Sequence, residues 1–291
     1  MEKIGFIGLG IMGKPMSIHL LKGGYEVVVL QSSGAATALE KEGAKLVENP
    51  AALAEQCDVI ITCLPDSPEV ESIVFGAEGL LKGMGEGKLF IDMSTISPST
   101  TATIYEAMKK VGVDALDAPV SGGEGGAKSA SLSIMVGGTQ SAFDRALPIF
   151  EVMGKNIVRI GESGAGQVTK ACNQIVVGLT IQAVAESLNL AKKAGVDVAK
   201  VREALLGGFA QSKIMEVHGQ RFLEGNYNPG FKINLHRKDM NIALQTGKDL
   251  SVPLPGSALV ASQMDSLIAT GGGELDHSAL AYMLGKLSGI E

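Results

Sequence analysis

Short apolar runs alternate with amphipathic, helix-like patterns along the first half of the chain. The apolar runs predict strands at residues 3–7, 26–30, 44–47, 58–64, 88–92, 114–118, 132–136 and 156–160. The patterns between them predict helices at residues 11–22, 35–42, 50–56, 98–110 and 141–153. The run 58–64 is continuously apolar, as in a strand buried on both faces of a parallel sheet. This alternation predicts a doubly wound α/β sheet.

The strand pattern stops near residue 164, and the rest of the chain has a helical period. Helices are expected at residues 164–194, 198–206, 211–224, 237–250, 256–271 and 276–288. In the first of these, apolar residues recur every three or four positions, at Val168, Cys172, Ile175 and Leu179. We therefore predict an α/β domain over residues 1–161 and an all-helical domain over residues 162–291.

Composition narrows the classes of function. The chain has 291 residues, 38 of them glycine, and a net charge of -6 without a basic tract, which argues against a nucleic-acid or anionic-membrane surface. Its three cysteines form no CxxC pair, as in a protein of a reducing compartment. Residues 175–185 are too short an apolar stretch to span a membrane, and the apolar N-terminus lacks a cleavage site. We expect a cytoplasmic location.

A glycine-rich turn follows the first expected strand and begins the first expected helix. Its GxGxxG sequence consists of Gly8, Leu9, Gly10, Ile11, Met12 and Gly13. In this context the first glycine permits a tight turn, the second lets the backbone approach a pyrophosphate, and the third lets helix and strand pack closely. The turn therefore predicts a dinucleotide site at a helix N-terminus.

The position that selects between NAD and NADP is occupied by a neutral residue. An acidic residue about 20 positions after the glycines commonly binds the adenosine ribose, but the second expected strand here ends at Leu30 and is followed by Gln31. Gln31 could bond a ribose, and no arginine stands beside it to bind a 2'-phosphate. The preference between NAD(H) and NADP(H) is left open.

Three further segments follow the C-terminal ends of expected strands, where ligands bind in such sheets. Leu64-Pro65 is as compatible with a simple turn as with a cofactor contact, and Ser94-Thr95 holds the equivalent place after the next strand. Ser121, Gly122 and Gly123 combine a hydroxyl with exposed backbone N–H groups, which suits a substrate carboxylate.

Polar residues on the helical half supply the remaining candidates. Lys170 and Asn173 lie opposite the apolar stripe of their helix, on a helix expected to border the nucleotide domain. Lys238, followed by Asp239, begins a later helix and is another candidate. The four histidines show no metal-ligand spacing, so we interpret them as structural and expect no metal.

Four motifs resemble those of the β-hydroxyacid dehydrogenases, the 3-hydroxyisobutyrate dehydrogenase group. They are Phe6–His19, Asp117–Gly123, Gly164–Asn173, and Leu235–Asp239 followed by Val252–Pro255. They occur in order and span essentially the whole chain. The resemblance implies a Rossmann domain followed by an all-helical domain that forms dimers or tetramers.

The resemblance also implies roles for individual residues. Lys170 would be the general acid and base, with Ser121, Gly122 and Asn173 as substrate contacts. The cofactor contacts would come from Leu64, Pro65, Thr95 and Lys238. One departure is that Ala130-Ser131 stands where the family usually has Gly-Thr.

The sequence thus predicts an NAD(P)H-dependent reductase of a small semialdehyde that carries a carboxylate. Similarity within the family favours reduction of tartronate semialdehyde to glycerate. Substrates of the 3-hydroxyisobutyrate, succinic semialdehyde, glyoxylate or hydroxymethylglutarate type are alternatives, as is an imine, although relatives that reduce imines commonly lack the lysine at position 170. A non-catalytic dinucleotide-binding scaffold is the alternative from another class.

Overall fold

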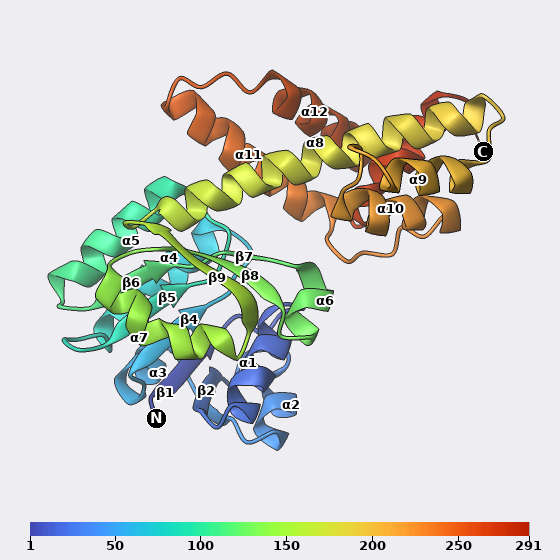
Figure 1. The fold of residues 1–291 in the computed structure, drawn as a ribbon. Helices are drawn as coiled ribbons and strands as arrows, with labels where there is room; N and C mark the ends of the chain where they lie inside the picture. Colours follow the sequence, from blue (N-terminus) through green and yellow to red (C-terminus); the bar gives the residue numbers. More distant parts are fainter. Residues whose placement is uncertain (291) are drawn as a thin grey trace. The chain divides into compact units, whose positions relative to one another are not determined.

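The computed structural model describes residues 1–290 and divides into two compact units, of which the first is Met1–Lys170 and the second begins at Ala171. Strands and helices alternate in the N-terminal unit (Figure 1). Its strands are β1 (Lys3–Ile7), β2 (Glu26–Leu30), β3 (Lys45–Val47), β4 (Val59–Thr62), β5 (Leu89–Asp92), β6 (Asp114–Asp117), β7 (Val120–Ser121), β8 (Leu132–Gly137) and β9 (Gly154–Gly161). Its helices are α1 (Gly13–Lys22), α2 (Ala36–Lys41), α3 (Pro50–Gln56), α4 (Ser67–Phe75), α5 (Pro98–Lys110), α6 (Gly123–Lys128), α7 (Gln140–Glu151) and the short 3-10 helix η1 (Leu80–Lys82).

These strands form one sheet within residues 1–290, in the order β3-β2-β1-β4-β5-β6-β8-β7, with β9 paired to β8. The pairs from β3 to β6 are parallel, and β8 joins β6 and β7 in antiparallel fashion. The chain runs outward from β1 to β3 and then restarts at β4 on the other side of β1. The carboxyl ends of β1 and β4 therefore flank the topological switch point, where such sheets bind ligands.

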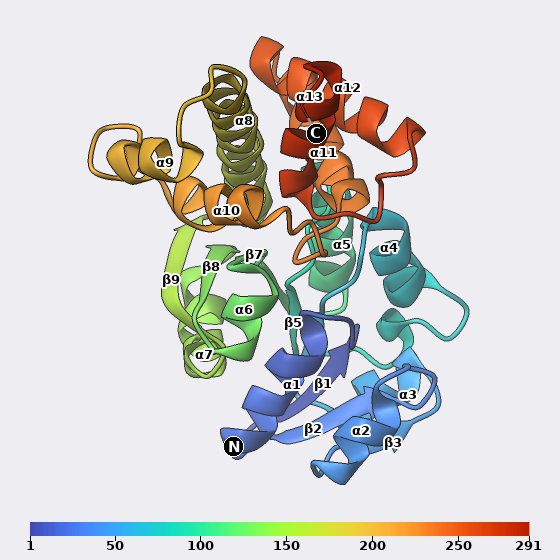
Figure 2. The ribbon, with the colours of Figure 1, turned by 90° about the vertical axis from the view of Figure 1, so that its right-hand side faces the viewer.

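Both faces of the parallel strands β1, β2, β4 and β5 are largely buried, because alternate residues of a strand point to opposite sides and helices cover both. On one face, Phe6 and Ile61 pack with residues of α1 and α7, such as Leu20 and Phe150. On the other face, Ile60 and its neighbours pack with α3, α4 and α5. Figure 2 shows these two helix layers on either side of the strands. The expected doubly wound α/β fold is confirmed.

The second unit is built from helices. Helix α8 (Ala165–Lys193) begins in the N-terminal unit and continues into the C-terminal one. The remaining helices are α9 (Val198–Leu206), α10 (Lys213–Glu224), α11 (Ile233–Asp249), α12 (Pro255–Ala269), the 3-10 helix η2 (His277–Ala279) and α13 (Leu280–Leu287). Ile181 of α8 contributes to a core with α11, α12 and α13, whereas Leu188 packs with α9 and α10. The all-helical C-terminal half is confirmed.

Two helices were not expected from the sequence. Helix α4 is capped by Asp66, whose carboxylate accepts the N–H of Ser67, and a proline follows in its first turn. Helix α6 occupies the glycine-rich segment that begins at Gly123, where no helix was predicted. The expected helix 276–288 is divided into η2 and α13.

Length and composition alone would allow α8 to cross a membrane, since it has 29 residues with a window of mean hydropathy 1.2. Half of that window is buried inside the protein. The core helix of a folded domain meets the same criteria, so α8 alone is weak evidence for a membrane span.

Candidate active site

The glycine turn after β1 has the geometry that its sequence predicts. Gly8 has a φ of +104°, and a Cβ there would lie 2.2 Å from the carbonyl oxygen of Cys63. A Cβ on Gly13 would lie 1.8 Å from the carbonyl oxygen of Gly8. The first and third glycines are therefore required by the protein's own packing.

Gly10 differs from these two, because a Cβ on it would meet no atom of the described chain within 4 Å. The space beside the Gly10 backbone is open, as expected where a ligand approaches. In addition, no side chain of the described residues caps the N-terminus of α1, which begins directly after Met12. Its first N–H groups suit a pyrophosphate, so the turn fits a dinucleotide.

The strand ends beside this turn are linked to one another. The backbone N–H of Leu64, after β4, donates to Ser94 Oγ, after β5, at 2.8 Å. Asp92 Oδ1 accepts from Thr62 Oγ1 at 2.8 Å and from the Ser94 N–H at 3.0 Å. The segments that contain Leu64-Pro65 and Thr95 therefore lie side by side at the carboxyl edge of the sheet.

Gln31 lies directly after β2, and its backbone N–H donates to the carbonyl oxygen of Val47 in β3 at 2.9 Å. Its side chain is exposed, as is that of Ser32. The position is the one from which a side chain would reach an adenosine ribose.

The proposed substrate segment comprises the end of one strand and the start of a helix. Ser121 ends β7, which pairs with β8, and Gly122 and Gly123 begin α6 with φ values of +139° and +60°. These φ values favour glycine. Nearby, Ala130 has a φ of +50°. An alanine thus adopts a left-handed backbone conformation at the position where the resemblance leads one to expect glycine.

Helix α8 is anchored at its start to the end of β6. Asp117 Oδ1 accepts the N–H of Gly164 at 2.7 Å, and its Oδ2 accepts the N–H of Gln167 at 2.9 Å. A Cβ on Gly166 would lie 2.4 Å from the carbonyl oxygen of Met135, so backbones are in close contact here. Burial raises the pKa of Asp117 to about 6, against the opposing effect of these two hydrogen bonds.

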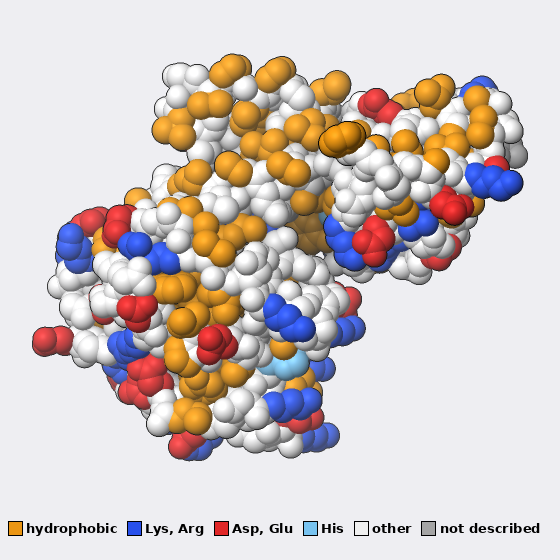
Figure 3. Space-filling model, viewed as in Figure 1, with side chains coloured by type: hydrophobic (Ala, Val, Ile, Leu, Met, Phe, Trp, Pro, Cys, Tyr) orange, Lys and Arg blue, Asp and Glu red, His pale blue; other side chains and the backbone are white. Residues whose placement is uncertain are grey.

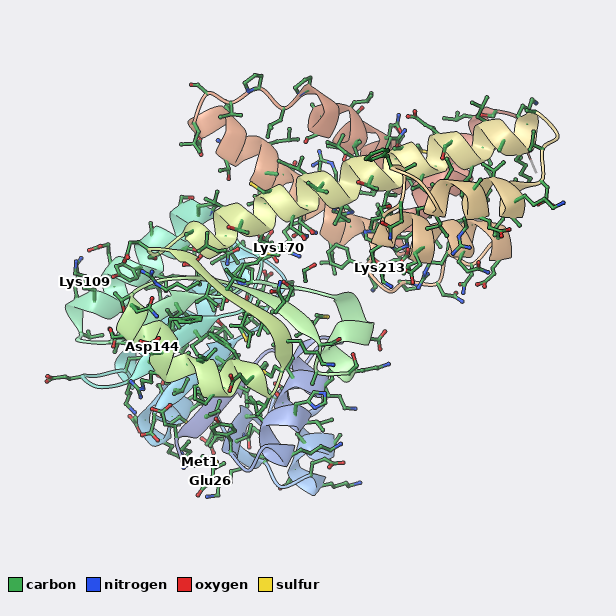
Figure 4. All side chains as sticks on the ribbon, in the orientation of Figure 1. Met1, Glu26, Lys109, Asp144, Lys170 and Lys213 are labelled. Carbon is green, nitrogen blue, oxygen red and sulfur yellow. The ribbon has the colours of Figure 1, made fainter. Side chains whose placement is uncertain are left out.

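The polar face of α8 is the buried one. Gln167 is 1% exposed and Lys170 is 7% exposed, whereas Val168 of the apolar stripe is 38% exposed. A lysine on the polar face of a helix is usually solvated, so burial sets Lys170 apart from a surface residue. Figure 4 shows Lys170 on the first turns of α8.

Asn173 and Lys238 belong to the C-terminal unit, where one chain of contacts connects them. Asn173 Nδ2 donates to Gln174 Oε1 at 2.7 Å, and Gln174 Nε2 donates to Asp239 Oδ2 at 2.6 Å. The other oxygen of Asp239 lies 2.8 Å from Lys238 Nζ. Gln174 and Asp239 thus connect two candidate site residues, Asn173 on α8 and Lys238 on α11. The sequence gave no sign of the hydrogen bond between Gln174 and Asp239, which lie 65 residues apart.

Three of the histidines gather in the C-terminal unit. His277 bonds both His236 and His218, at 3.0 and 3.1 Å, while His19 bonds the carbonyl oxygen of Lys128. Within residues 1–290, donor atoms of His218, Asp276 and His277 lie within 4.8 Å of one another, close enough to hold a metal ion. Spacing along the sequence did not reveal this group.

The carboxylate of Asp276 is already engaged within the protein. One oxygen accepts from the backbone N–H and hydroxyl of Ser278, and the other accepts from the N–H groups of Gly230 and Phe231. Two of these bonds cap the start of η2 and the other two join it to the segment before α11, which indicates a structural role.

Comparison with known proteins relates both halves of the chain to dehydrogenases. Residues 3–161 match the family described as the NAD binding domain of 6-phosphogluconate dehydrogenase. Residues 164–284 match the family described as the NAD-binding domain of NADP-dependent 3-hydroxyisobutyrate dehydrogenase.

Individual relatives match over nearly their full length. The chain is 48% identical to 2-hydroxy-3-oxopropionate reductase of Escherichia coli (strain K12), over 97% of each chain. It is 37% identical to 3-hydroxyisobutyrate dehydrogenase of Pseudomonas aeruginosa, over 97% of this chain and 96% of that one. The solved structure of Mycobacterium tuberculosis 3-hydroxyisobutyrate dehydrogenase with L-serine matches with a TM-score of 0.89 and 31% identity, over 98% of this chain and 99% of that one.

Proposed function

Because this chain belongs to the β-hydroxyacid dehydrogenase family, the 3-hydroxyisobutyrate dehydrogenase group, we propose that it reduces tartronate semialdehyde to glycerate. The protein is an oxidoreductase of hydroxyacids that uses NAD(H) or NADP(H). This identity replaces the alternative of a non-catalytic scaffold. The choice of substrate is carried by one observation, the similarity to the Escherichia coli reductase over almost the whole of both chains.

We propose the following roles for individual residues. We assign the substrate carboxylate to Ser121, to the N–H groups of Gly122 and Gly123 at the start of α6, and to Asn173. Two left-handed glycines turn the backbone sharply here, which suits a small anion. The dinucleotide would be held by the turn at residues 8–13, by Leu64, Pro65 and Thr95, and by Gln31 and Lys238.

Lys170 is the proposed general acid. When bound, the reduced nicotinamide supplies the hydride to the aldehyde carbon. The oxygen of that carbonyl gains negative charge, and a proton from Lys170 Nζ would neutralise it. In the oxidative direction the neutral amine would take the hydroxyl proton. Lys170 is 7% exposed, so few water molecules would compete with the substrate for this proton.

A panel of substrates tests the proposal. Nicotinamide absorbance would be followed with tartronate semialdehyde, methylmalonate semialdehyde, succinic semialdehyde and glyoxylate, with each cofactor in turn. We expect the highest kcat/KM with tartronate semialdehyde. A higher value with methylmalonate semialdehyde would favour a 3-hydroxyisobutyrate dehydrogenase instead, which the Pseudomonas aeruginosa relative makes the second candidate.

We also propose that the protein is a cytoplasmic homodimer or homotetramer. Helix α8 exposes apolar residues in the C-terminal unit, with Val176 64% and Leu190 73% exposed. Figure 3 shows hydrophobic side chains over the helices of this unit. Exposed apolar faces of this kind are typical of subunit interfaces. Light scattering on the parent and on Val176→Glu tests this, since a charge at the interface would shift an oligomer toward monomer.

A further inference from the structure

Gln167 joins α8 to the segment after β5. Its side-chain Nε2 donates to the carbonyl oxygen of Ser94 at 2.8 Å, and its Oε1 accepts the N–H of Ile96 at 3.2 Å. The two bonds are therefore made to the residues immediately before and after Thr95. A side-chain amide can donate and accept at once, so it binds this backbone as a neighbouring strand would.

The same residue is also held through its backbone. The N–H of Gln167 donates to Asp117 Oδ2 at 2.9 Å, and the side chain is 1% exposed. Gln167 therefore contacts the end of β6 and the segment after β5, both in the N-terminal unit. Buried hydrogen bonds of this kind hold their partners in one geometry, because breaking them leaves polar groups unpaired.

Lys170 follows Gln167 by three residues on the same helix, so the two lie on one face. Both are buried in the described structure. Any rotation or shift of the first turns of α8 against the Ser94–Ile96 segment would change the place of Lys170 relative to Thr95.

We infer that Gln167 is a positioning residue, which fixes Lys170 relative to the cofactor-binding segment around Thr95. This inference rests on the proposed function, in which Lys170 donates the proton and Thr95 contacts the dinucleotide. A displacement of about 1 Å between reacting groups can lower a rate by about 100-fold. Gln167 thus acts on the reaction through the position of another residue.

The test uses Gln167→Glu, which keeps the shape of the side chain. An ionised carboxylate accepts but cannot donate, so it would repel the carbonyl oxygen of Ser94. A protonated carboxyl can still donate one hydrogen bond and accept another, which are the two bonds that the amide makes here, and burial raises its pKa. We expect kcat to fall by about 10- to 100-fold at alkaline pH and to recover toward the parent value as the pH falls.

The remaining variants separate positioning from a general loss of structure. Gln167→Met lacks both bonds and should lose activity at every pH, whereas Gln56→Glu makes the same chemical change at an exposed site and should behave as the parent does. The dissociation constant of the cofactor, from quenching of its fluorescence, should change by less than about threefold, because Gln167 is not among the residues proposed to hold the dinucleotide. The inference would be overturned if kcat of Gln167→Glu, divided by kcat of the parent, stayed constant across pH. It would also be overturned if kcat of this variant at alkaline pH were within twofold of the parent value.

Hydrogen exchange distinguishes failure of this inference from failure of the proposed function. If the parent reduces no semialdehyde in the panel, the proposed function is wrong, and the exchange rate of the Ile96 amide becomes the deciding measurement. We expect this amide to exchange at least tenfold faster in Gln167→Met, or in Gln167→Glu at alkaline pH if the methionine variant does not fold. An unchanged rate would overturn the positioning role.

Discussion

The Nδ1 atoms of His236 and His277 lie 3.0 Å apart inside the C-terminal unit, so one of them carries a proton that the other accepts. The Nε2 atoms of His277 and His218 make a second such bond at 3.1 Å. With neutral rings, protons on His218 Nε2, His277 Nδ1 and His236 Nε2 satisfy both bonds and the 3.4 Å contact to the carbonyl oxygen of Gln174. This arrangement leaves His218 Nδ1 without a proton. The 3.6 Å between that atom and Asp276 Oδ1 is too long for a hydrogen bond, which agrees with this assignment.

The neutral histidines predict a loss of stability in acid. Burial lowers the pKa of His218, and burial with the neighbouring His236 lowers the pKa of His277 well below 6.5. The unfolded chain therefore binds protons near pH 6.5 that the folded chain does not bind. These histidines contribute stability that is complete above about pH 6.5 and is lost as the pH is lowered toward about 5. Asp117, whose pKa burial raises to about 6, acts in the opposite sense over part of this range, so the histidine contribution is read as the difference between the parent and a histidine variant.

The midpoint of urea unfolding, measured across this range, checks the prediction. His277→Gln should be less stable overall and should show a weaker dependence on pH. His19→Gln is the matched control, because His19 lies in the other unit, on the carbonyl oxygen of Lys128. A His277→Gln variant whose midpoint depends on pH between 7 and 5 as steeply as that of the parent would contradict the assignment of neutral rings.

Replacement of the proposed general acid should slow the chemical step. Lys170→Ala should lower kcat by about 10²- to 10⁴-fold, the usual effect of losing a general acid, with little change in cofactor affinity. Lys170→Arg keeps the positive charge but cannot give up its proton at neutral pH, so it should be similarly slow. Turnover of the alanine variant within a few-fold of the parent would show that another group delivers the proton.

Loss of the proposed carboxylate contacts should weaken substrate binding. Ser121→Ala and Asn173→Ala should each raise KM, since a hydrogen bond to a charged group contributes roughly 1.5–3 kcal/mol. For Asn173 the effect includes release of Gln174, to which its amide donates. The comparison substrate is an aldehyde without a carboxylate, with which both variants should match the parent. An equal loss on that substrate would remove these residues from carboxylate binding.

Local patterns predicted most of the fold, because the signals lie within a few residues of one another. Helix α5 begins at Pro98 after Ser97, whose hydroxyl accepts the N–H of Thr100, and the sequence placed both ends correctly. Helix α4 has a similar start in Asp66, Ser67 and Pro68, so its signal was present and was overlooked.

The candidate site was less predictable, because its contacts join residues far apart in the chain. An apolar stripe on a helix usually faces the protein interior, but here Gln167 and Lys170 are buried and Val168 is exposed. The partners that make burial of Gln167 possible lie some 70 residues earlier, at Ser94 and Ile96. The histidine group similarly combines three separate helices, and no spacing pattern reveals it.

The left-handed alanine at position 130 predicts a stabilising substitution. A non-glycine residue with positive φ carries a steric cost of about 1–2 kcal/mol, and Ala130 has a φ of +50°. Part of the gain from glycine is offset by its greater freedom in the unfolded chain, so Ala130→Gly should raise the free energy of unfolding by about 0.5–1 kcal/mol. The control is Ala38→Gly in α2, an exposed helical position where glycine should destabilise. Chemical denaturation of both variants should give shifts of opposite sign.

Cofactor preference should be adjustable at Gln31, which lies at the end of β2 with an exposed side chain. A carboxylate at this place would bond the ribose hydroxyls and repel a 2'-phosphate, but a neutral amide does neither strongly. Because no arginine stands beside Gln31 in the sequence, we expect the parent to use both cofactors with modest discrimination. Gln31→Asp should shift the ratio of kcat/KM toward NADH, and Gln31→Asn should leave it nearly unchanged. If the aspartate variant keeps the parent's ratio, Gln31 does not contact the cofactor, and Ser32 and Ser33 determine the preference between NADH and NADPH.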